Sequence, residues 1–183
     1  IATHLKTRSQ VGRLVAALIV VGALVGGYAV LQHYGHDFLD LGEETGGGRL
    51  RATSFMGNSI FSAAVMSMTI PITLMASVIT FSEPAASPGR LGGNSKQWLL
   101  SSGITSGWGA ILSIQLLGIA FTLSRGPWLG TILSLAAFLG LALALVGWRA
   151  FGRGALVLGL GATFALAILQ WQGSVSILGM GPW

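Results

Sequence analysis

Two arginines stand where long uncharged stretches of the sequence begin. Arg51 precedes the stretch 52–82, and Arg125 lies in the short break before 126–148. A helix N-terminus offers free N–H groups and a partial positive charge, and arginine adds a rigid fork of donors that matches phosphate oxygens. If the two helix starts point at one place, they form an anion site. Alternatively, each arginine pairs with a local acid or, in a membrane protein, extends to the lipid headgroups.

Two histidines, spaced three positions apart, are the other candidates for chemistry. His33 and His36 have Asp37 and Asp40 close by, and such a cluster could ligate a metal, transfer protons or hold a pigment. The remaining histidine, His4, lies far from them in the sequence and completes no metal site. We interpret the pair as a solvated helix end and expect no metal and no cofactor. His33 becomes a cofactor ligand only if a pigment or haem is bound.

Several other chemistries find no support in the sequence. The chain has no cysteine, which removes a disulfide framework, a thiolate metal site and a cysteine nucleophile. It contains neither a P-loop nor a dinucleotide fingerprint. We expect no nucleic-acid partner.

The composition indicates the class of protein whose elements hold these residues in place. Of the 183 residues, 52% are hydrophobic and 8% are charged, against about 25% charged in a soluble domain. The mean hydropathy is +0.76. An ordinary soluble domain and a disordered tail are both excluded, and a helical membrane protein fits.

Charged residues divide the chain into uncharged stretches, each longer than the roughly 20 residues that a membrane-spanning helix needs. The sequence therefore predicts an all-α, polytopic transmembrane helix bundle that forms a single membrane domain over residues 1–183. No acid lies in any apolar core, which argues against an ion-coupled transporter. The five predicted helices lie near 12–32, 57–81, 98–122, 128–148 and 154–172.

Charge placement predicts the orientation of the bundle. With the N-terminus in the cytoplasm, seven basic residues lie in cytoplasmic segments and three in outer segments, which agrees with the positive-inside rule. The C-terminus is then extracytoplasmic. The cytoplasmic set is Lys6, Arg8, Arg13, Arg90, Lys96, Arg149 and Arg153, and the outer set is Arg49, Arg51 and Arg125.

The connections and the glycines add two structural expectations. The longest connection, the outer loop 33–56, carries most of the acids, whereas the link 124–127 is so short that the third and fourth helices must be adjacent and antiparallel. Gly22 and Gly26 form a small-residue pattern, as do Gly103 and Gly107. Such patterns let membrane helices approach closely, so we interpret both as ordinary helix packing.

At these arginines the sequence resembles a known family. The stretch LQHYGHDFLD…GGGRLRATSFMGNSIFSAAVMSMTIPITL is similar to the Gln-bearing helix end, arginine loop and TSTFGNPN-x-x-A helix of the O-antigen ligase and polymerase superfamily. The stretch IAFTLSRGPWLGTILSLAAF is similar to that family's T-x-SRG-x-x-LG turn. The order and the spacing of the two motifs agree with the family from about residue 12 to 172.

The resemblance implies a bacterial inner-membrane glycosyltransferase of the GT-C type, in lipopolysaccharide or cell-envelope glycan biosynthesis. Such enzymes move a glycan from an undecaprenyl pyrophosphate carrier to an acceptor, and outer-face arginines hold the pyrophosphate without a metal. By motif position, the catalytic residues would be Arg51 and Arg125. Asn58, Ser124 and Thr53 would contact substrate. The partners would be membrane lipid and a lipid-linked glycan.

The sequence departs from the family pattern in two ways. Ser59 and Ile60 replace the family's Pro-Asn. Family members also have about ten or more helices, with a histidine thought to act on the acceptor in a later outer loop. We therefore expect this chain to correspond to the middle of such a protein and to be inactive alone.

A second interpretation is structural. The chain would be a non-catalytic subunit of a larger respiratory or photosynthetic membrane complex, with other membrane subunits as its partners and with His33 as a pigment or haem ligand.

Overall fold

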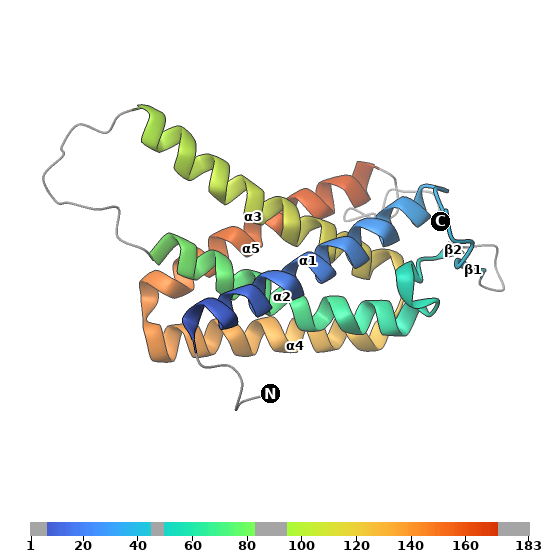
Figure 1. The fold of residues 1–183 in the computed structure, drawn as a ribbon, viewed down its shortest axis with the longest axis horizontal. Coiled ribbons are helices and arrows are strands. Elements are labelled where there is room, and N and C mark those ends of the chain that lie inside the picture. Colours follow the sequence, from blue (N-terminus) through green and yellow to red (C-terminus); the bar gives the residue numbers. More distant parts are fainter. Residues whose placement is uncertain (1–6, 45–49, 83–94, 172–183) are drawn as a thin grey trace, which may run out of the picture.

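The computed structural model describes residues 7–44, 50–82 and 95–171, and it is an all-α helix bundle (Figure 1). The predicted fold class is confirmed, and each predicted helix overlaps an observed one. Over the described ranges the long helices are α1 (Arg8–His33), α2 (Ser59–Ser82), α3 (Ser95–Phe121), α4 (Arg125–Leu141) and α5 (Trp148–Trp171).

The helices are those of a multi-pass membrane protein. Among the described residues, four segments are long and apolar enough to cross a membrane, and α3 adds the shorter apolar helix Ser106–Phe121. No water is available in the bilayer to satisfy the backbone, so helices that bond internally are the natural spanning element. The four long segments are Arg8–His33, Ser59–Thr80, Arg125–Val146 and Phe151–Trp171.

Local signals in the sequence set the helix ends. Thr7 caps α1, because its side chain accepts a hydrogen bond from the N–H of Gln10 while the Gln10 side chain accepts one from the Thr7 N–H. After α4, a π-helical turn over Ala142–Val146 leads into Gly147, whose φ is +105°. Glycine adopts this backbone conformation without steric cost, so the chain can reverse into α5 there.

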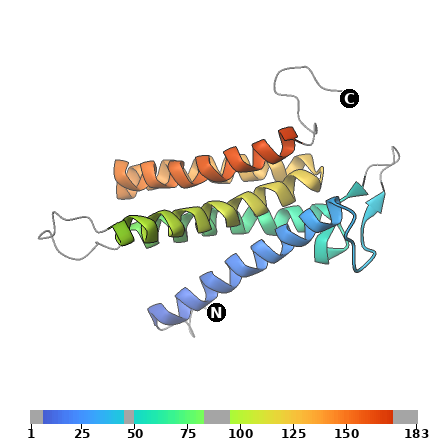
Figure 2. The ribbon, with the colours of Figure 1, turned by 90° about the horizontal axis from the view of Figure 1, so that it is seen from above.

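Helix α3 lies at the centre of the packing. It contacts α1, α2 and α5, whereas α4 packs mainly against α2. Figure 2 shows α1 inclined to the other helices. The turn between α3 and α4 is as short as expected, but the two helices diverge from it. Leu123 at this turn has a φ of +52° and Ser124 is extended, and this backbone redirects α4 onto α2.

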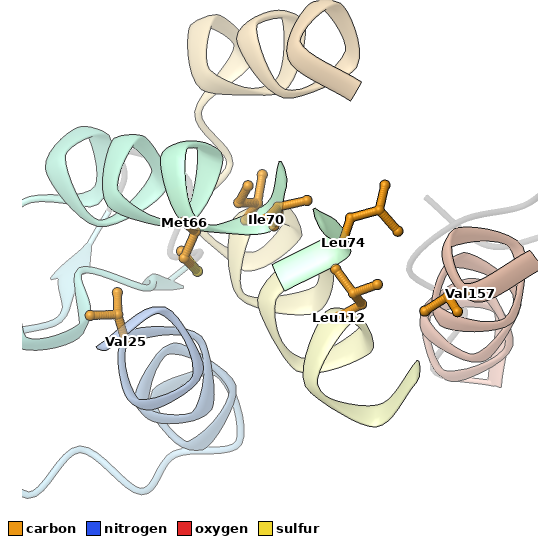
Figure 3. Close-up of a cluster of buried hydrophobic side chains, with 7 residues drawn as sticks. Val25, Met66, Ile70, Leu74, Leu112 and Val157 are labelled. Atoms are coloured by element: carbon orange, nitrogen blue, oxygen red, sulfur yellow. The ribbon is translucent and has the colours of Figure 1, made fainter. Parts of the chain in front are cut away.

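One cluster of buried apolar side chains joins four helices (Figure 3). Val25 of α1 and Val157 of α5 lie at its two edges, and residues of α2 and α3 fill the space between. Burying a side chain of this size stabilises a protein by about 1.5–3 kcal/mol in water, and within a lipid bilayer close packing takes over that role. The other members are Met66, Ile70, Leu74, Leu112 and Ile119.

Glycines allow α1 to approach α3 closely. A Cβ atom on Gly26 would lie 2.9 Å from the backbone oxygen of Ile114, and one on Gly118 would lie 2.8 Å from the Cα of Gly26. The packing interpretation of the Gly22–Gly26 pattern is therefore confirmed. At Gly107 a Cβ would meet nothing within 4 Å, so that glycine makes no such contact.

The functional candidates gather at one end of the bundle, where α1 and α3 finish and α2 and α4 begin. We call it the Arg51 end. Here the chain forms two short antiparallel strands, β1 (Glu43–Glu44) and β2 (Leu50–Arg51), in which Glu43 pairs with Arg51. A 3₁₀ turn, η1 (Ser54–Met56), then leads into α2. Figure 1 shows the strands beside the end of α1.

Candidate functional site

Arg51 joins the strand β2 to the turn between α3 and α4. Its Nε donates a hydrogen bond to the carbonyl oxygen of Thr122 over 3.2 Å, and one terminal nitrogen donates to Ser124 Oγ over 3.1 Å. The neighbouring N–H of Ala52 donates to the carbonyl of Phe121 over 3.0 Å. These bonds fix the plane of the guanidinium. They also bring together the two motifs that the sequence separates by more than 70 residues.

Ser124 is the N-cap residue of α4, but it does not cap the helix in the usual way. Its hydroxyl donates to the carbonyl of Thr122 and accepts from Arg51, and it makes no capping bond to the N–H groups of α4. Arg125 is the first residue of α4, and its side chain is exposed. An arginine and the positive end of a helix dipole therefore stand next to the Arg51–Ser124 contact.

Gln32, near the end of α1, holds the segment that follows Arg51. Its side-chain oxygen accepts hydrogen bonds from the N–H groups of Thr53, at 3.1 Å, and Ser54, at 2.6 Å. Its side-chain nitrogen donates to the Thr53 hydroxyl over 3.4 Å. All three residues are buried. One amide thus satisfies two backbone donors that no helix or strand partner reaches.

Replacing Gln32 by leucine should therefore destabilise this end of the protein. The substitution leaves the buried N–H groups of Thr53 and Ser54 without an acceptor, and each such loss costs about 1–3 kcal/mol. We expect the free energy of unfolding in detergent to fall by about 2–4 kcal/mol. Gln170→Leu on the exposed side of α5 is the matched control. A Gln32→Leu protein as stable as the wild type would contradict this role.

Asp37 organises the loop after α1. Its carboxylate accepts hydrogen bonds from the Tyr28 hydroxyl over 2.7 Å and from the N–H groups of Gly42 over 2.7 Å and Leu41 over 3.0 Å. Partial burial raises the pKa of this carboxyl, but the bonds that it accepts, from Tyr28 first and then Gln32, outweigh burial and lower the pKa below its ordinary value. The charged form therefore holds the loop.

This shift predicts how the loop responds to acid. Because the folded pKa of Asp37 is lowered, its contribution is complete above the unfolded value, near 3.8, and is lost as pH falls through the folded value. Below the folded pKa of Asp37, we expect the N–H groups of Leu41 and Gly42 to lose protection, so that they exchange hydrogen faster relative to the intrinsic rate at the same pH. Asp37→Asn should exchange faster already at neutral pH. Asp40→Asn, at an exposed carboxyl, should not, and equal protection in all three proteins would refute the assignment.

A pocket of about 490 Å³ opens between the end of α1, the loop after it and β2. Its wall combines one arginine, one histidine, one glutamine and two acids with three small residues. Of the predicted site residues, Arg125, Asn58, Thr53 and Ser124 are not part of this wall. The lining residues are Gln32, His33, Gly35, Asp37, Asp40, Gly42, Arg51 and Ala52.

His33 lies in this wall and is held by an aromatic contact. Its ring stacks on Phe121 of α3, with centroids 3.7 Å apart and planes 4° from parallel. Phe121 is buried, and its carbonyl accepts the bond from Ala52. The sequence interpretation of His33 as a solvated helix end is therefore incomplete, because the side chain is half-buried and faces a ligand-sized space.

Two residues beside the Arg51 contact have an unusual backbone conformation. Ser54 and Leu123 have φ values of +50° and +52°, a region that residues other than glycine rarely adopt. Each costs of order 1–3 kcal/mol and is held by its surroundings, here the Gln32 bond for Ser54. Such strained positions cluster at functional sites, which supports this end of the bundle as the site.

The remaining predicted contact residues have supporting roles. Asn58 precedes α2, and its side-chain oxygen accepts from the N–H of Ile60 over 2.9 Å, which makes it a helix cap. Thr53 is fully buried, and its hydroxyl donates to the carbonyl of Leu41 over 2.5 Å. In this conformation both stabilise the loop. Ser124 contacts Arg51 directly, and its predicted contact with substrate stays a prediction.

Gln32 and Phe121 are important residues that sequence reasoning did not select, and Asp37 was named only as a neighbour of the two histidines. A glutamine within the last turn of an apolar helix was the available signal for Gln32, since a polar side chain there needs partners. Within the described ranges, no three His, Asp or Glu side chains gather closely enough to hold a metal ion.

The site is thus a polar pocket in which one arginine links a strand to the start of a helix some 70 residues later. Comparison of the chain with protein-family models, with curated proteins and with solved structures found no match.

Proposed function

We propose that the chain is part of a membrane glycosyltransferase that transfers a glycan from an undecaprenyl pyrophosphate carrier to an acceptor. The observation that carries the proposal is the contact of Arg51 with Thr122 and Ser124, which brings the two family-like motifs into one site. Beside it stand the start of α4 and the exposed Arg125. Guanidinium donors and a helix N-terminus are the groups that suit a diphosphate.

In this proposal the residues act by electrostatic stabilisation. An acceptor hydroxyl oxygen forms a bond to the anomeric carbon of the glycan, the bond from that carbon to the diphosphate oxygen breaks, and the hydroxyl proton passes to a base. Negative charge then develops on the departing diphosphate. Donors already fixed in place stabilise that charge without reorganising, and this is why the bonds that immobilise Arg51 favour catalysis.

The proposal also implies a membrane and an orientation for the protein. The protein would lie in the bacterial inner membrane with its N-terminus in the cytoplasm, which puts the Arg51 end on the extracytoplasmic side. Charge counting supports this orientation, since seven of the ten basic residues then lie in cytoplasmic segments.

Arg125→Lys tests the proposal in the native full-length protein. Lysine keeps the charge but cannot form the two-pronged contact of a guanidinium with phosphate oxygens, so we expect glycan transfer to fall at least about tenfold. Arg149→Lys, an exposed arginine at the other end of the bundle, should transfer normally. Transfer that survives both Arg51→Ala and Arg125→Ala would contradict the proposal. Purification in a stoichiometric, coloured complex would favour the non-catalytic subunit instead.

A further inference from the structure

We propose that His33 is a second ligand-binding group of the Arg51 pocket and that it binds the anionic ligand in its protonated form. The inference rests on the proposed function only in assuming that this pocket takes a diphosphate.

The charges of the pocket wall carry the proposal. Its charged or titratable lining residues are Arg51 from β2, Asp37 and Asp40 from the loop after α1, and His33 from α1 itself. With a neutral histidine, the formal charge of this wall is −1, which repels an anion. With an imidazolium it is zero, and two cationic groups face the ligand. The pocket therefore suits a diphosphate much better when His33 carries a proton.

The stacking geometry keeps His33 in place in both protonation states. One face of its ring stacks on Phe121, with ring centroids 3.7 Å apart and planes 4° from parallel. Tyr34 makes an edge contact with the His33 ring, with centroids 5.6 Å apart. The ring nitrogens of an imidazole lie on the ring edge, so gaining a proton does not require the stack to break. An imidazolium is moreover attracted to the face of an aromatic ring. The charge is thus added to a side chain that is already positioned.

Other titratable groups near the pocket could also make ligand binding depend on pH, and their effect must be distinguished from that of His33. Asp37 is held in its charged form by the bonds of the loop. Asp40 is exposed in the same wall, and the backbone of Glu43 lies opposite that of Arg51 in the register of the two strands. Phe121, the contact from α3, does not titrate.

Linkage gives the expected result. If the ligand binds the protonated form of His33 more tightly than the neutral form, binding takes up a proton, and affinity rises as pH falls. A synthetic farnesyl diphospho-N-acetylglucosamine is the probe, because both of its phosphates are esterified and do not titrate in the pH range compared. For the purified full chain we expect binding to be about tenfold tighter at about pH 5.5 than at about pH 8.

Variants assign this dependence to one residue. His33→Gln and His33→Phe should bind equally at both pH values to within about twofold, and the phenylalanine preserves the aromatic stack. His36→Gln, which lies outside the pocket wall, should keep the full dependence. Asp40→Asn should strengthen binding at both pH values and leave the ratio unchanged. A second measurement needs no variant: calorimetry in buffers of different ionisation enthalpy should show uptake of up to about one proton.

The outcomes separate this inference from the proposed function. Full pH dependence in His33→Gln and His33→Phe, or binding by the wild type without pH dependence or proton uptake, would overturn the role of His33 and leave the diphosphate site standing. Absence of any binding by the wild type at either pH would overturn the proposed function itself. Two results together support both proposals. Arg51→Ala should lose binding at both pH values, and among the variants that still bind, only those at His33 should lose the difference in affinity between the two pH values.

Discussion

Arg51→Ala should bind a lipid-linked diphosphate about a hundredfold more weakly than the wild type. Removing an arginine that donates to a charged ligand costs about 1.5–3 kcal/mol, and the upper part of that range corresponds to a hundredfold change in affinity. The substitution also removes the bonds to Thr122 and Ser124, so the start of α4 loses its connection to β2. Equilibrium binding of the purified protein in detergent measures the effect.

Two further variants separate charge from geometry. Arg51→Lys keeps a positive charge but cannot reach the Thr122 carbonyl and the Ser124 hydroxyl with one planar group, so we expect an intermediate loss. Arg149→Ala, at an exposed arginine on the other end of the bundle, should bind like the wild type. Equal binding by the wild type and Arg51→Ala would remove Arg51 from the site.

Gly118→Leu should strongly destabilise the packing of α1 against α3. A Cβ atom at Gly118 would lie 2.6 Å from the sulfur of Met66 and 2.8 Å from the Cα of Gly26, and the rest of a leucine side chain has no space. Met66 can shift, but the backbone of α1 cannot move away without separating from α3. Overpacking costs about 1–3 kcal/mol in most cases and occasionally more, and we expect a value near the top of that range because backbone atoms block the new side chain.

The fluorescence of the six tryptophans during thermal unfolding reports this loss. Gly140→Leu is the matched control, because a Cβ there meets nothing within 4 Å and the position is exposed on α4. We expect a large drop in the unfolding midpoint of Gly118→Leu and little change in Gly140→Leu. Similar midpoints in the two variants would mean that the close approach of α1 and α3 does not hold the bundle together.

Much of the fold follows from where the charges stand. Each predicted apolar core overlaps an observed helix, because a long run without charged residues leaves a membrane helix as the element that satisfies the backbone. The packing order of the helices was harder to predict. The short link at 124–127 suggested that α3 and α4 pack together, but the positive φ of Leu123 turns α4 towards α2. A hydropathy pattern carries no information on that angle.

The site could be predicted only in part. Motif order selected Arg51 as a catalytic residue and Ser124 as a substrate contact. The structure brings the two side chains into contact, and their roles stay predictions. The sequence did not indicate that Gln32 would hold the backbone of Thr53 and Ser54, since this contact spans more than 20 residues and depends on how the loop folds back on α1. Thr53 was predicted from the sequence to contact substrate. In the structure its polar side chain is buried and supports the loop.

Photo-crosslinking tests most directly whether this pocket holds a lipid-linked diphosphate. A farnesyl diphosphate whose diphosphate end carries a small photoreactive group would be irradiated with the full-length protein in membranes, and the labelled residues identified by mass spectrometry. We expect saturable labelling of the pocket wall between Gln32 and Ala52 and of the turn at Thr122–Trp128. Unmodified diphosphate lipid should compete with this labelling, and the neutral alcohol should not. Labelling confined to the apolar faces of α4 and α5, with no competition by the diphosphate, would contradict it.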